Sequence, residues 1–134
     1  MMEGVQIEAG RIGKVVYGRM APNEDLVQGI EKLCIAQGIR HALVRCGLGS
    51  LVDACLDLPS GARPTVSGPA VEGLSLFGEV RTHADGTVDT LRADLSGVVV
   101  NAEGRVASGV FVAGANPVFA TFEVTLEEWL PQAA

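Results

Sequence analysis

Aromatic residues are scarce in this sequence of 134 residues, which holds one Trp, one Tyr and four Phe. A core with so few rings must be built mainly from Val, Leu, Ile and Ala, and the β-branched Val and Ile among them are enriched in strands. Glycine is abundant instead, with 17 residues, and glycine supplies the backbone conformations that tight turns need. The composition therefore favours strands over long helices.

Long hydrophobic runs are also missing, because no stretch approaches the ~20 apolar residues that span a bilayer. The N-terminal segment 1–4 lacks a basic region followed by a hydrophobic run, so we expect a cytoplasmic protein with no membrane contact. The chain length fits one domain, residues 1–134. We expect its core to lie over about residues 11–128.

Cysteine and histidine are too few and too scattered to predict a metal site. Cys34, Cys46 and Cys55 form no C-x-x-C pair, and their apolar neighbours indicate buried, reduced thiols. His41 and His83 are the only histidines, and neither has a cysteine or carboxylate nearby at a recognised ligand spacing. We expect neither a metal nor another cofactor.

Basic residues are outnumbered, with 10 Lys and Arg against 16 Asp and Glu and a net charge of −6. Such a field repels polyanions, and the basic residues are spread along the chain with no run of even two. The charge therefore disfavours nucleic acid as a partner.

One helix is predicted, over about residues 24–37. Asn23 stands where an N-cap residue belongs, apolar residues recur at helical spacing after it, and Gly38 is a stop signal. Gly47-Leu48-Gly49 is interpreted as a turn between two strands. The expected strands cover residues 11–20, 39–47, 50–59, 71–82, 87–100, 104–113 and 117–127, with a loop over 59–70 and a turn at 84–86. This order predicts an α+β fold, a largely antiparallel β-sheet flanked by one main helix.

Two stretches, 97–100 and 111–122, are apolar on both sides of the predicted pleat. A single helix covers only one face of a sheet, so the other apolar face predicts a subunit interface. The alternative is that the sheet curls into a closed barrel that buries the second face itself.

One predicted strand is a candidate for ligand binding. Leu91, Ala93 and Leu95 alternate with Thr90, Arg92, Asp94 and Ser96, which places the polar set on one face. Arg19 and Arg45 could join Arg92 on an anionic ligand, because guanidinium groups pair bidentately with carboxylate or phosphate. The competing interpretation is an ordinary solvated strand face.

Familiar catalytic and nucleotide-binding motifs are missing. Gly47-Leu48-Gly49-Ser50 begins like a phosphate-binding loop but lacks the third glycine and a following helix. No G-x-S-x-G elbow is present. The local sequence gives no positive indication of an enzyme.

Several strings resemble the plants-and-prokaryotes-conserved (PPC) domain, in the same order and at similar spacing. The likeness runs from about Val15 to Glu128 and is carried by GRMAPNEDL at 18–26, GSLVDACL at 49–56, GLSLFG at 73–78, EGRVASGV at 103–110 and TFEV at 121–124. The resemblance implies a compact α+β domain that assembles as a homotrimer.

The resemblance also implies a position for a metal site that this chain does not retain. Many prokaryotic relatives carry three histidines near the subunit interface, and alignment from Gly104 puts Asp94, Ser96 and Val110 at those positions. Valine cannot bind a metal and serine is a poor zinc ligand. Plant relatives join the domain to an AT-hook that enters DNA, and no such arm is found here.

Three functions from different classes remain open at this point. The first is a non-enzymatic, trimeric interaction or small-ligand-binding module, regulatory in role, with a polar or anionic ligand at Arg92, Asp94 and Ser96. The second is a DNA-binding protein acting through a local patch made from Arg40, Arg45, Arg63 and Arg81, as the family is commonly labelled. The third is an enzyme with an interface pocket and Asp94 or Glu79 as general base.

Overall fold

The computed structural model describes residues 4–85 and 88–133. It holds one helix and eight strands: β1 Gly10–Met20, α1 Leu26–Gln37, β2 His41–Leu51, β3 Ala54–Asp57, β4 Thr65–Val66, β5 Val71–Asp85, β6 Val88–Val100, β7 Val106–Phe111 and β8 Val118–Pro131. The strands form one sheet in the order β1-β8-β2-β5-β6-β7-β3-β4. Every pairing in it is antiparallel. The predicted α+β class is confirmed.

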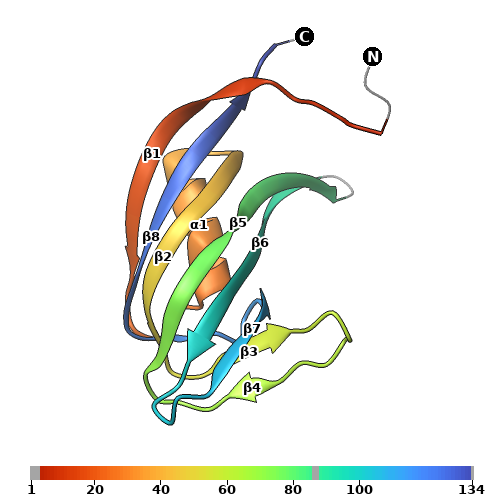
Figure 1. Ribbon diagram of the computed structural model, residues 1–134. Coiled ribbons are helices and arrows are strands. Elements are labelled where there is room, and N and C mark those ends of the chain that lie inside the picture. Colours follow the sequence, from red (N-terminus) through yellow and green to blue (C-terminus); the bar gives the residue numbers. More distant parts are fainter. Residues whose placement is uncertain (1–3, 86–87, 134) are drawn as a thin grey trace.

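The sheet is open and not a closed barrel, because β1 and β4 occupy its two ends. Figure 1 shows α1 lying against one face of the curved sheet, with the opposite face uncovered. We call the face turned away from α1 the outer face. The core lies between α1 and the sheet, where Leu26, Ile30 and Cys34 of the helix meet buried strand residues such as Phe122 and Leu126.

The helix begins two residues later than predicted, because Asp25 and not Asn23 is its N-cap. The Asp25 carboxylate accepts a hydrogen bond from the Gln28 N–H at 3.0 Å, which satisfies one of the free N–H groups of the first turn. Asn23 instead adopts a left-handed conformation, φ 72°, in the turn after β1. At the other end, Gly38 has φ 67° and ends the helix as predicted.

The predicted turn at Gly47-Leu48-Gly49 is wrong, since β2 runs through these residues without a break. The glycines serve close packing against the buried Phe122 ring. A Cβ on Gly47 would lie 3.1 Å from the ring, and one on Gly73 of the next strand 2.8 Å from it. Side chains at these positions would displace the ring, so the chain has glycine in the middle of strands.

Other departures from the predicted elements are local. β4 is a two-residue strand inside the predicted 59–70 loop, where it pairs with β3. Residues 112–117 form a turn rather than a strand that is apolar on both sides. Cys34 and Cys55 are buried as predicted, but Cys46 is exposed on the sheet. The turn predicted at 84–86 extends outside the described residues.

The turn before β8 is held by one buried amide. Asn116 is fully buried. Its Oδ1 accepts from the Cys55 N–H at 2.8 Å, and its Nδ2 donates to the carbonyls of Cys55 at 3.0 Å and Val112 at 2.9 Å. The Asn116 N–H donates to the Asp25 carboxylate at 2.9 Å. This residue therefore ties β3, the turn and the start of α1 together.

Replacing Asn116 with alanine should lower the free energy of unfolding by about 2–3 kcal/mol, because backbone groups of Cys55 would be left buried without partners. Urea denaturation measures the change. Gln132→Ala, which removes an exposed amide near the C-terminus, should change stability by less than about 0.5 kcal/mol. Equal effects of the two substitutions would show that the buried amide contributes little.

Candidate ligand-binding face

The polar residues of β6 lie on the outer face. Arg92 and Asp94 are exposed and Ser96 is half-buried, whereas Ala93 and Leu95 between them are buried. The burial follows the alternation seen in the sequence. The N–H of Ala93 donates to the Glu31 carboxylate of α1 at 2.9 Å, so the helix also holds this part of β6 in place.

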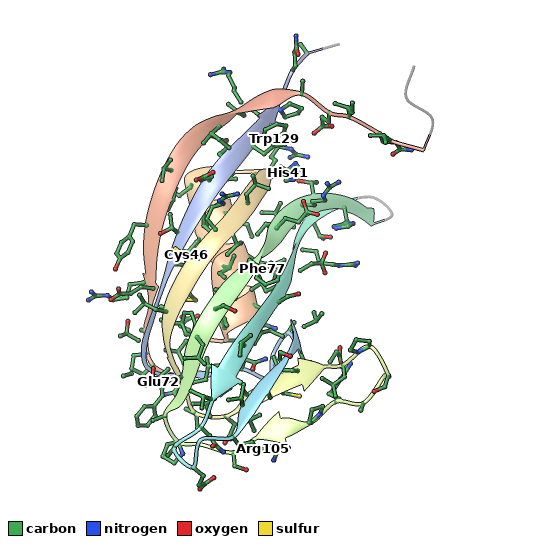
Figure 2. The ribbon with its side chains drawn as sticks, in the orientation of Figure 1. His41, Cys46, Glu72, Phe77, Arg105 and Trp129 are labelled. Carbon is green, nitrogen blue, oxygen red and sulfur yellow. The ribbon has the colours of Figure 1, made fainter. Side chains whose placement is uncertain are left out.

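An apolar stripe crosses the middle of the outer face. It is formed by the exposed residues Tyr17 on β1, Cys46 on β2, Phe77 on β5 and Val110 on β7. The half-buried Thr125 of β8 and Ser96 of β6 lie between them in the same row. Phe77 is 57% exposed although it lies near the centre of the sheet, and Figure 2 shows it on β5, in the middle of the uncovered face. A large side chain so placed is typical of a surface that binds another molecule.

A hollow of about 370 Å³ lies beside Phe77. It is lined by Asp57, Leu58, Pro59, Phe77, Ser96, Gly97, Val98, Ser108, Gly109 and Val110. Most of these groups are apolar or small, with one carboxylate and two hydroxyls. Asp57 is held by Arg63, with 2.6 Å between Oδ1 and Nε. The hollow therefore offers an apolar wall and few polar contacts.

The three positions that the family resemblance assigns to metal ligands fall close together here. Ser96 and Val110 are directly paired across β6 and β7, and Asp94 lies two residues from Ser96 on the same strand. The side chains do not fit a metal, because only Asp94 is a good ligand. Within residues 4–85 and 88–133, no group of three or more His, Cys, Asp or Glu side chains could hold an ion.

Arg19 and Arg45 are placed away from Arg92 and bound to carboxylates of β8. Arg19 lies 3.1 Å from Glu123, and the Tyr17 hydroxyl donates to the same carboxylate. Arg45 lies 3.9 Å from Glu127. Strands β8, β2 and β5 separate Arg19 from β6, about 19 Å at the usual strand spacing. The structure therefore does not bring the three arginines to one point.

The Glu79 carboxylate on the outer face contacts two side chains, His41 and Arg81. Its Oε2 lies 3.1 Å from His41 Nε2 and 2.9 Å from Arg81 Nε. Partial burial opposes ionisation, but the hydrogen bonds from Arg81 and His41 prevail and lower the pKa of the Glu79 carboxyl. A carboxylate with a lowered pKa is a weaker base, so its environment does not favour Glu79 as a general base.

Sequence reasoning did not assign His41 or Trp129 to any site, and it named Arg81 only in a DNA patch. Figure 2 shows His41 and Trp129 side by side at one end of the sheet. These two residues are neighbours because β2 pairs with β8, and no local motif in either segment predicts that pairing.

The family assignment rests on a match over most of the chain. The model of the Plants and Prokaryotes Conserved (PCC) domain, for which we keep the abbreviation PPC, matches residues 7–130. The chain belongs to this family. The resemblance in the short strings is thereby confirmed.

Solved structures share the fold at low identity. A PPC protein of Pyrococcus horikoshii is 24% identical with a TM-score of 0.75, covering 98% of this chain and 87% of its own. A metal-containing protein of Archaeoglobus fulgidus is 22% identical with a TM-score of 0.78, covering 96% and 89%. A protein of Bacteroides thetaiotaomicron, provisionally named as DNA-binding, is 15% identical with a TM-score of 0.70, covering 92% and 84%.

These likenesses establish the fold and not an activity. A search among curated proteins found no significant match. In the described part of the chain, no helix combines the length and apolarity that a membrane span requires.

Replacing Glu79 with glutamine should destabilise the protein at pH 7, because the bonds to Arg81 and His41 favour its ionised form. Since the folded-state pKa is lowered, this stability is fully present above the unfolded value of about 4.3. It is lost as the pH falls through the lower folded value. Urea denaturation at pH 7 and near pH 3 should therefore give a larger difference between wild type and variant at pH 7. Glu72→Gln, on the exposed part of the same strand, is the matched control. A pH-independent difference would contradict the assignment.

Proposed function

We propose that this PPC domain is a homotrimeric, non-enzymatic binding module, regulatory in role and acting in the cytoplasm. The observation that carries the proposal is the exposure of Phe77 beside the hollow, on a sheet face that no described element covers. Burial of apolar area drives association, and one stripe repeated on three subunits would be covered by assembly about a three-fold axis. The hollow would then lie close to the interface.

The ligand of such a module would be a small polar or anionic molecule that contacts β6. Ser96 lines the hollow, and Asp94 and Arg92 follow it along the same face. Apolar groups of the ligand would pack on Phe77 and Val110, while hydroxyl or charged groups would bond to the β6 side chains. The loss of the family's metal ligands is consistent with binding rather than metal chemistry.

DNA binding is the second candidate, because relatives from Bacteroides thetaiotaomicron and Ralstonia eutropha are provisionally named as DNA-binding. Ion pairing in this chain argues against it. Arg45, Arg63 and Arg81 each lie within 4.0 Å of a carboxylate. Phosphate contacts would have to compete with these pairs, in a molecule with net charge −6.

Sedimentation should give the mass of about three chains for the wild type, and Phe77→Ser should shift the equilibrium to monomer because it removes the ring from the centre of the apolar stripe. Ile35→Ser is the matched control. Ile35 is 66% exposed but lies on α1, behind the sheet. A wild-type monomer at micromolar concentration, or equal effects of the two variants, would contradict assembly through the outer face.

Duplex DNA, whether A·T-rich or random, should not bind appreciably at about 0.15 M salt, where exposed charges are screened beyond ~8 Å. Fluorescence anisotropy is the measurement. A double variant, Glu123→Gln with Glu127→Gln, should bind somewhat better, because it releases Arg19 and Arg45 from their carboxylates. Micromolar binding by the wild type that weakens steeply with salt would favour the DNA-binding candidate instead.

A further inference from the structure

A notch opens in the sheet at the point where β2 begins. β8 and β5 lie on either side of β2 and continue past it, to Pro131 and Asp85, whereas β2 starts at His41. The notch has a volume of about 430 Å³, and its lining includes His41, Arg81 and Trp129, one from each of the three strands. It lies toward the opposite end of the outer face from the hollow beside Phe77.

The strand registers place four aromatic or basic side chains in one row across this end of the face. His41 pairs with Arg81, and Arg81 pairs with Arg92. Glu128 pairs with Ala42, so the next residue, Trp129, lies beside His41, as Figure 2 shows. From β8 to β6 the row therefore reads Trp129, His41, Arg81 and Arg92.

Arg81 and Arg92 are like charges directly opposite each other, an arrangement that destabilises an antiparallel pair. Glu79 compensates Arg81 through its Nε, and the Arg81 side chain is exposed. In the described residues, Arg92 has no carboxylate within 4.0 Å, although Arg19 and Arg45 on the same face each have one. An oxyanion placed between Arg81 and Arg92 would relieve the repulsion and use the donors of both.

Three acidic groups near the row are already engaged, whereas Asp94, two residues from Arg92 on the same face, is exposed. Besides Glu79, the Glu128 carboxylate accepts the Lys14 N–H at 3.0 Å. Glu8, on the segment before β1, accepts the Trp129 indole N–H at 2.7 Å. Its charge reaches Arg81, where it adds to the stronger effect of Glu79 in raising the pKa of that guanidinium. The rim therefore already holds one carboxylate of the chain, beside Trp129.

We propose that this row binds a small molecule with a phosphoryl group at one end and a flat ring at the other, as in a nucleoside monophosphate. The phosphoryl group lies between Arg81 and Arg92, and the ring packs on Trp129. Two and a half strand spacings, about 12 Å, separate Trp129 on β8 from the midpoint between β5 and β6. This site lies at the other end of the face from the hollow beside Phe77, shares Arg92 with the ligand proposed for that hollow, and does not depend on the trimer.

The test uses Trp129, the one tryptophan of the chain, as its own reporter. Adenosine monophosphate should quench its fluorescence saturably. Adenosine lacks the phosphoryl group and inorganic phosphate lacks the ring, so each should bind at least about tenfold more weakly. Arg92→Gln should lower the affinity for adenosine monophosphate by at least about tenfold, because the phosphoryl group loses one of its two guanidinium partners. Arg105→Gln, an exposed arginine at the far end of the molecule in Figure 2, should leave binding unchanged.

Three results would overturn the proposal: no saturable quenching by adenosine monophosphate, equal binding of adenosine, or equal effects of Arg92→Gln and Arg105→Gln. Because Arg92 is exposed, its substitution should not impair folding, and the melting temperature verifies this. Sedimentation of the same variants reports assembly separately. If the protein is a trimer but does not bind the nucleotide, only the nucleotide site is refuted. If it is a monomer that binds the nucleotide, only the proposed trimer is refuted.

Discussion

One helix has to cover an eight-stranded sheet, and much of the molecule follows from that constraint. A helix is about 10 Å wide, whereas eight strands at their usual spacing extend over about 34 Å. The sheet therefore curves around α1, as Figure 1 shows, and its outer face is left without a covering layer. Parts of that face are polar, as at Glu79 and Asp94, and can remain in water. The stripe through Phe77 is mainly apolar, and its exposure is the basis for the proposed assembly.

The sequence predicted those features that depend on neighbouring residues. The alternation from Leu91 to Ser96 placed the polar side chains on one face, and the structure has them there. The stop signal at Gly38 ended the helix correctly. The short strings predicted the family, and the family match over residues 7–130 confirms it. In each case the cause and its effect lie within a few residues of each other.

Features that depend on distant residues were predicted wrongly or not at all. Gly47 resembled a turn residue because a sequence cannot show that the Phe122 ring lies against it. Asn23 looked like the N-cap because the bond that selects Asp25 comes partly from Asn116, 91 residues away. His41, Arg81 and Trp129 share a notch only because β2 pairs with both β5 and β8. Register is set by the packing of whole strands, and a one-residue shift would turn each side chain to the other face.

The net negative charge of the protein and a local anion-binding site are compatible, because the two act over different distances. A long polyanion such as DNA makes many contacts, so it experiences the summed charge of −6 and the carboxylates that already hold Arg19, Arg45 and Arg63. A single phosphoryl group experiences mainly the charges within a Debye length of ~8 Å. At the end of the outer face those charges include two opposed guanidinium groups, the carboxylate of Glu79 bonded to one of them, and the nearby carboxylates of Glu8 and Asp94. The same surface can therefore reject a duplex and still accept a small anion.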